Sequence, residues 1–105
     1  MADFAFDEKR RGRVAELVLS GDLDMSATFR LEPVLDRLFD GDEVSELVLD
    51  LSGVSFVDSS GLGLLIATHA RSQEAECPMA IVNASPEVQR VFRIAGVDDV
   101  LPITP

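Results

Sequence analysis

The chain has 105 residues and a formal net charge of −10, with 47% hydrophobic and 27% charged residues. This length fits one domain, residues 1–105, and the composition excludes the disordered, collagen-like and low-complexity classes of protein. The negative charge is concentrated in residues 22–58, which hold ten acidic residues and two basic ones. Such a field repels nucleic acid and anionic membranes, so no direct binding to either is expected. A basic protein surface is the expected partner.

Two strands are predicted at the start of the chain. Phe4 and Phe6 alternate with polar residues, and a second apolar run spans residues 14–19 after a turn at Gly12. The two runs should pair as a hairpin. The basic cluster in residues 9–13 is interpreted as the solvated turn of this hairpin rather than as a nucleic-acid patch.

A helix is predicted after the segment GDLD, and it should end near Gly41. Its apolar residues recur at three- and four-residue spacing, which gives one buried stripe. They are Ala27, Leu31, Val34, Leu35 and Leu38. Pro33 cannot donate a hydrogen bond to the carbonyl of Phe29, so a kink or a loosened first turn is expected.

The second half of the chain is predicted to alternate strands with helices. A buried strand at residues 47–51 is followed by a short loop, the segment SFVD and a second helix. Another short strand should lie at residues 79–82. On the second helix, Gly61 and Gly63 keep the first turn slim, and four residues are expected to share one face: Leu62, Leu65, Ile66 and His69.

A third helix and a last strand complete the predicted elements. Ser85 and Pro86 are suited to the N-cap and the first helical position, and Gly96 to the end of this helix. Residues 100–103 are read as the final strand. Together these elements predict a single α/β domain with a mixed sheet of four to five strands and helices packed against it.

Two acidic, serine-bearing connections should lie where strands end, which is where sites collect in such sheets: GDLDMSA and DSSGLG. In the second, Asp58, Ser59 or Ser60 could simply cap the following helix. A serine in a first helical turn also lies beside unpaired backbone N–H groups, which would favour an added phosphate. Asp22 and Asp24 are read as turn and cap formers rather than as metal ligands.

Several kinds of enzyme are excluded by residues that the chain lacks. Ser59 and Ser60 have no GxSxG context, and His69 falls on the opposite side of the same helix from Ser60, so no nucleophile and base pair is expected. The single lysine, Lys9, is not in a phosphate-binding loop. A response-regulator site that uses Asp58 remains a weak alternative. No enzymatic activity and no cofactor are therefore expected.

Cellular location is suggested by the single cysteine and by the absence of long apolar segments. Cys77 alone cannot form an internal disulfide or a cysteine cluster. The start of the chain has no apolar signal core, and the longest apolar stretch is too short to cross a bilayer. A cytoplasmic location is expected.

Three segments, taken in order, resemble the successive blocks of the STAS domain of bacterial anti-sigma factor antagonists. They are GDLDMSA, LVLDLSGVSFVDSSGLGLLI and NASPEVQRVFRIAGVDDVLPI. The similarity covers nearly the whole chain, and VDSSGLG is a specific block. Pro33 departs from the pattern expected in the middle of the first helix.

The resemblance implies partner switching. The unphosphorylated antagonist would bind an anti-sigma factor, usually an ATP-dependent serine kinase, and so release a sigma factor. Phosphorylation would end the contact, and a metal-dependent serine phosphatase would restore it. By position, the resemblance makes Ser60 the phosphorylated residue. The expected partner-binding residues are Asp22, Asp24, Asp58, Ser59, Ser60, Gly61 and Leu62.

Other functions remain open from the sequence. The chain could be a STAS-like scaffold in a signalling or transport complex whose serines are never modified, or it could bind a small molecule. If phosphorylation occurs, it should act at the interface rather than unfold the domain, because helix N–H groups can accommodate the added charge.

Overall fold

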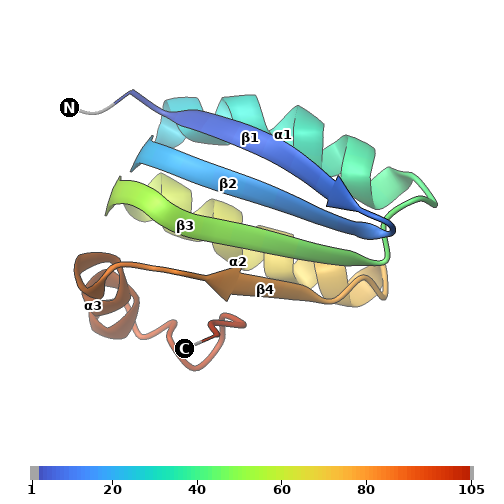
Figure 1. Cartoon of the computed structure of the whole chain (residues 1–105). Helices are drawn as coiled ribbons and strands as arrows, with labels where there is room; N and C mark the ends of the chain where they lie inside the picture. The colour runs from blue at the N-terminus through green and yellow to red at the C-terminus, as the bar shows by residue number, and fades with distance from the viewer. Residues whose placement is uncertain (1–2, 105) are drawn as a thin grey trace.

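A four-stranded sheet in the order β1-β2-β3-β4 forms the centre of the fold (Figure 1). The computed structural model describes residues 3–104. β1 pairs antiparallel with β2, whereas β3 is parallel to both β2 and β4, so the predicted mixed sheet is confirmed. The strands are β1 (Ala5–Arg11), β2 (Val14–Leu23), β3 (Glu46–Val57) and β4 (Met79–Val82).

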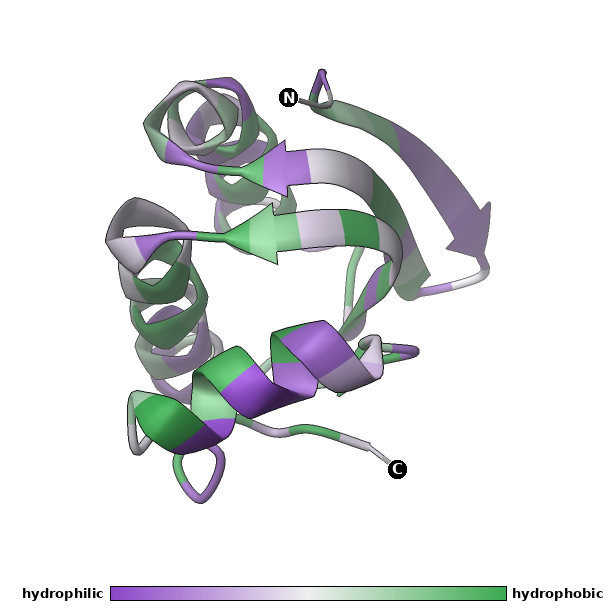
Figure 2. Ribbon diagram, turned by 90° about the vertical axis from the view of Figure 1, so that its left-hand side faces the viewer, coloured by the Kyte–Doolittle hydropathy of each residue, from purple (hydrophilic) through white to green (hydrophobic). Residues whose placement is uncertain are grey.

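Three helices accompany the sheet: α1 (Met25–Asp40), α2 (Ser59–Glu74) and α3 (Pro86–Ile94). α1 and α2 both lie against one face of the sheet, behind the strands in Figure 1 and to the left of the sheet in Figure 2, and α3 lies close to the end of β4 (Figure 1). Each parallel pair of strands is joined through one of the two covering helices, as a parallel connection requires. The helices α1 and α2 therefore begin at the same edge of the sheet.

The core lies between the sheet and these two helices. Alternate residues of β2 point toward the helices and are fully buried, whereas their neighbours are half-buried on the other face. The predicted stripe of α1 is confirmed, with Val34 half-buried and the other four residues buried. The buried residues of β2 and α1 are Ala15, Leu17, Leu19, Gly21, Leu23, Ala27, Leu31, Leu35 and Leu38.

The amino-terminal hairpin is tighter than expected. β1 continues through Arg11, which pairs with Val14, so only Gly12 and Arg13 form the turn. Gly12 has a φ of +58°, the conformation that a two-residue hairpin turn favours at its first position. Most of the basic cluster thus belongs to a strand rather than to a loop.

β3 also differs from the prediction, because it runs without a loop from Glu46 to Val57. Its pairing with β2 continues past Ser52 through a register shift between Val18 and Ser20. Gly53 allows this close pairing, since a Cβ there would lie 2.6 Å from the Cβ of Ser20. The irregularity that the sequence suggested is a bulge within a continuous strand.

The buried face of α2 differs from the predicted face, because most of the buried residues lie one position earlier in the sequence than the predicted ones. The buried residues are Gly61, Leu64, Leu65, Thr68 and Ser72, whereas Ile66 is 39% exposed. Leu62 and His69 are half-buried. Two hydroxyl residues can occupy the buried face because each donates to a carbonyl of its own helix: Thr68 to Leu64 and Ser72 to His69, both at 2.7 Å.

The final strand at residues 100–103 is not formed. The chain turns after α3, with the N–H groups of Val100 and Leu101 both donating to the carbonyl of Val97. Ile103 alone makes an isolated parallel bridge with Ile81. α3 itself begins and ends as predicted, with Ser85 accepting from the N–H of Val88 and Gly96 at a φ of +74°.

α1 continues without interruption through Pro33. Of the two expected alternatives, a kink or a loosened first turn, the loosened first turn is not found, because Asp24 caps that turn and Pro33 lies nine residues after Asp24 on the exposed side of the helix. Water can therefore reach the carbonyl of Phe29, which receives no hydrogen bond from the proline.

Candidate functional site

The two acidic connections lie side by side at the carboxyl ends of β2 and β3. Leu23 pairs with Val57 at the end of the parallel ladder, and the N–H of Asp58 donates to the carbonyl of Leu23 at 3.3 Å. Asp24 and Asp58 are the next residues of the two strands. The sequence prediction that both connections lie where strands end is confirmed, and the structure places them next to each other at one edge of the sheet.

Both aspartates cap the helices that follow them. Oδ1 of Asp24 accepts from the N–H of Ala27 at 3.1 Å and from the hydroxyl of Ser26 at 2.9 Å. These two hydrogen bonds, the backbone one first, lower the pKa of Asp24. Oδ1 of Asp58 accepts from the N–H of Gly61 at 3.0 Å. Each carboxylate stabilises the first turn of a helix and places a negative charge at this edge.

Gly61 sets the close approach of α2 to β2. A Cβ at this position would lie 2.2 Å from the carbonyl oxygen of Leu23, so only glycine fits without displacement of one of the two elements. Gly63 has no atom within 4 Å of an equivalent Cβ. The two glycines thus have different roles, one in packing and one that leaves the surface of α2 open.

Ser60 lies in the first turn of α2, two residues after the N-cap, and is half-buried. It lines a groove of about 490 Å³ between α1 and α2, together with Met25 and Phe29 of α1. These two apolar side chains are 59% and 68% exposed. Ser59, the first residue of α2, is exposed outside the groove lining.

The fold places the remaining predicted residues, Leu62 and Asp22, in different surroundings. Leu62 packs against the edge of the hydrophobic core and is half-buried. Asp22 lies on the face of β2 opposite to Leu23, where its carboxylate accepts from the hydroxyl of Ser55 at 3.3 Å. The structure therefore brings Asp24, Asp58 and Ser60 together and turns Asp22 toward the other side of the sheet.

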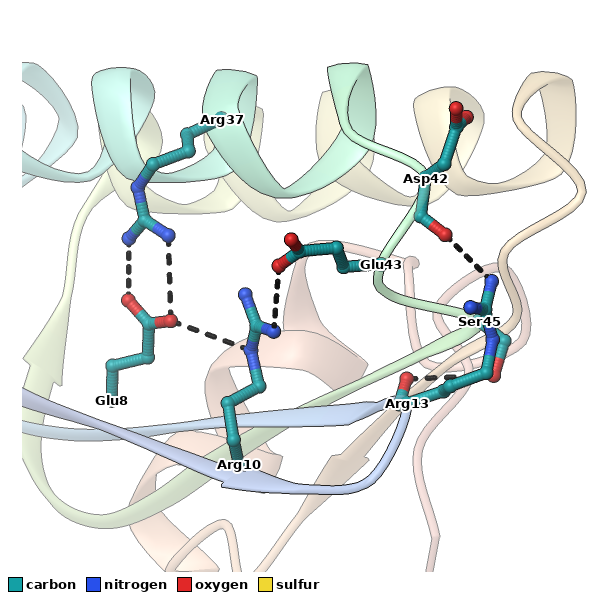
Figure 3. A network of polar contacts seen from close by, with 7 residues as sticks. All are labelled: Glu8, Arg10, Arg13, Arg37, Asp42, Glu43 and Ser45. Carbon is teal, nitrogen blue, oxygen red and sulfur yellow. Dashed lines mark hydrogen bonds and ion pairs between the residues drawn. The ribbon is translucent and has the colours of Figure 1, made fainter.

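The two cations of the acidic segment, Arg30 and Arg37, are both engaged by other groups of the domain. Arg30 donates to the carbonyl of Phe4 and lies over the rings of Phe4 and Phe6. Arg37 pairs with Glu8 at 2.5 Å, in a network that also holds Arg10 (Figure 3). The hydrogen bond from Arg37 lowers the pKa of Glu8. The candidate site keeps its negative character as a result.

Among the described residues, no histidine lies beside Ser60. His69 lines a different cavity, with Ser72 and Cys77 at the far end of α2, as the nine-residue separation from Ser60 predicted. Across residues 3–104, no three His, Cys, Asp or Glu side chains are placed to share a metal ion. What the site presents is a hydroxyl beside a groove with apolar and acidic walls.

Met25 and Phe29 were missed by the sequence analysis. A signal for them exists, because both are apolar yet fall outside the spacing of the buried stripe that contains Ala27 and Leu31. Large apolar residues on the solvent side of an amphipathic helix indicate a contact surface.

None of the described helices is both long enough and apolar enough to cross a lipid bilayer.

Comparisons with known proteins agree with this arrangement. The STAS domain model matches residues 5–105. The chain is 30% identical over 86 residues to an anti-sigma-B factor antagonist of Staphylococcus aureus, covering 82% of this chain and 79% of that protein. It is 29% identical over 96 residues to an anti-sigma F factor antagonist of Paenibacillus polymyxa, covering 91% and 81%.

A solved structure supports the same assignment. The crystal structure of an anti-sigma factor antagonist from Mycobacterium paratuberculosis is 28% identical, with a TM-score of 0.84 over 98% of this chain and 86% of that one. The chain belongs to the STAS domain family of anti-sigma factor antagonists.

Proposed function

We propose that this protein binds an anti-sigma factor in its unphosphorylated state, and that phosphorylation of Ser60 ends the contact. The observation that supports this most directly is the position of Ser60, at the start of α2 and within the lining of a groove that carries exposed apolar side chains. The unmodified hydroxyl of Ser60 is small and neutral, so it leaves the groove open to a partner. A phosphate on the same oxygen would stand directly at the contact surface.

The partner is inferred from the family. The anti-sigma factor would be a serine kinase that uses ATP, and its capture by this protein would release a sigma factor. A metal-dependent serine phosphatase would remove the phosphate and restore binding. The protein itself acts by binding, in the cytoplasm, without a catalytic centre of its own.

Charge explains why the modification would weaken the contact. A phosphate adds about −1.5 to −2 charges near neutral pH. It would join the carboxylates of Asp24 and Asp58 at the same edge. The two cations of the acidic segment, Arg30 and Arg37, are already held by other groups. A partner surface fitted to a neutral hydroxyl would then meet a bulky dianion. Steric exclusion and the cost of desolvating that charge both oppose binding.

The test is phosphorylation by the anti-sigma factor kinase purified from the source organism, followed by peptide mapping. The wild-type protein should gain one phosphate on Ser60, whereas Ser60→Ala should gain none and should keep binding the kinase. Ser59→Ala is the matched control for the position of the site, and it should still be phosphorylated on Ser60.

Two outcomes would contradict the proposal in different ways. A phosphate found on Ser59 would move the site by one residue. Binding without modification of either serine would leave an unmodified STAS scaffold, the alternative that the sequence left open. Weaker binding of Ser60→Asp would agree with the charge argument, although one carboxylate carries less charge than a phosphate.

A further inference from the structure

The groove between α1 and α2 extends well beyond the serine. Its lining on α2 runs from Ser60 to Arg71, which are eleven positions or about 16 Å apart along the helix. The phosphate acceptor lies at one end only. A partner that touched Ser60 alone would leave most of this groove empty.

The apolar wall of the groove includes two large side chains that are mostly exposed. Met25 and Phe29 are one helical turn apart on α1, so their side chains lie on the same side of the helix. They are among the most exposed large apolar residues of the described chain, at 59% and 68%. Buried Leu35 and Leu64 continue the apolar lining deeper in the groove. An exposed apolar surface of this kind is typical of a protein contact.

Two of the three charged side chains that line the groove are acidic. Glu32 and Asp36 both line it, and Arg71 is its only cationic side chain among the described residues. Arg71 is already engaged: it pairs with Asp36 at 2.5 Å and with Asp40 at 3.4 Å, and it lies over the ring of Phe39. Glu32 forms no ion pair among residues 3–104. Its carboxylate is available to a cation on a partner.

We propose that this groove holds an apolar segment of the anti-sigma factor that carries a lysine or arginine opposite Glu32, with Met25 and Phe29 as the apolar anchors. The inference rests on the proposed function, because the occupant is the partner named there. It adds a docking contact that is separate from the phosphate acceptor. The apolar contact supplies affinity, and Glu32 selects a basic segment.

The apolar contact can be tested with the full chain and the purified anti-sigma factor by titration calorimetry. Phe29→Ser should weaken binding at least about tenfold, since buried aromatic anchors dominate contacts of this type. Ile94→Ser is the matched control, because Ile94 is 79% exposed on α3 and lies outside the groove. It should bind within about twofold of wild type. Thermal melting of both variants checks that the fold is retained.

The acidic contact needs a charge variant. Glu32→Lys should also weaken binding, and the affinity of this variant should depend less on salt than that of wild type. Asp99→Lys makes the same charge change in the exposed turn after α3 and should have little effect. Equal affinities for the groove variants and their controls would overturn the proposal.

The same titrations separate this inference from the proposed function. If wild type binds and is phosphorylated on Ser60 while Phe29→Ser binds equally well, the groove proposal is wrong and the proposed function stands. If wild type neither binds the anti-sigma factor nor accepts phosphate, the proposed function is wrong, and the groove proposal that rests on it is wrong as well. Binding that is lost in Phe29→Ser and Glu32→Lys but kept in both controls supports the groove.

Discussion

Asp24 and Asp58 have structural roles that any test of partner binding has to respect. Each carboxylate accepts hydrogen bonds from the first turn of a helix. Replacement by alanine would remove the charge and the cap together, so a loss of binding would have two explanations. Asparagine retains an oxygen acceptor for the cap and removes the negative charge. It is therefore the appropriate substitution at both positions.

The cap at Asp58 gives the first stability prediction. Asp58→Ala should lower the free energy of unfolding by about 1 kcal/mol, because the N–H of Gly61 loses its acceptor. Asp58→Asn should lower it by much less. Urea unfolding followed by circular dichroism measures both. Equal losses in the two variants would mean that the charge rather than the hydrogen bond stabilises the start of α2.

The cap at Asp24 gives a prediction of pH dependence. Hydrogen bonds from Ala27 and Ser26 lower the pKa of Asp24 below its ordinary value of 3.8. A lowered pKa means that the contribution to stability is complete above the unfolded value and is lost as the pH falls through the folded value. The stability advantage of wild type over Asp24→Asn should be constant near neutral pH and shrink below about pH 4. Unfolding curves at pH 7 and pH 3 provide the comparison, and an advantage that grows in acid would contradict it.

At the residue scale, the sequence predicts a residue well when its role follows from local chemistry. The positions of Asp58 and Ser60 at the start of a helix follow from the motif and the helical spacing. Asp22 was misplaced in the expected site because β2 continues through Leu23, with a register shift between Gly21 and Asp22. Strand alternation then turns Asp22 toward the other face of the sheet.

At the element scale, the packing of α2 against β2 determines where Ser60 lies. Gly61→Ala should destabilise the protein strongly, because the new methyl group would meet the carbonyl of Leu23 at 2.2 Å. Gly63→Ala is the matched control: it meets nothing within 4 Å, and alanine should raise the free energy of unfolding by up to about 1 kcal/mol through its higher helix propensity. Thermal melting of the two variants should give shifts of opposite sign. A stable Gly61→Ala protein would show that α2 can move away from β2.

The elements that the sequence predicted best are those with one strong local signal. α1 has a clear apolar stripe, and α3 has a serine cap, a proline and a terminal glycine. The predictions for β3, α2 and residues 100–103 were less accurate because tertiary contacts decide them. Pairing with β2 keeps β3 continuous through Gly53, and internal hydrogen bonds allow Thr68 and Ser72 to be buried.

At the scale of the whole molecule, acidic side chains and the exposed side chains of Met25 and Phe29 occur together along the groove and at the edge where α1 and α2 begin. The ten acidic residues between positions 22 and 58 include both helix caps and the two acids that line the groove. The basic residues of β1 lie toward the other end of the sheet, where Arg10 forms ion pairs with Glu8 and Glu43 (Figure 3). The acidic side chains at this edge and along the groove suit a basic partner.

A charge at Ser60 should leave the fold of the molecule intact, since the side chain lines an open groove rather than the core. The amino-terminal end of α2 favours a negative charge by about 0.3 to 1 kcal/mol, and repulsion from Asp24 and Asp58 acts in the opposite direction. Ser60→Asp should therefore shift the melting temperature by less than about 5 °C. Ser59→Asp, at the exposed first position of the same helix, is the control. Because both variants keep the core unchanged, weaker binding of Ser60→Asp at an unchanged melting temperature would place the switch at the interface. A cooperative loss of structure in Ser60→Asp alone would instead make Ser60 part of the packing between α1 and α2.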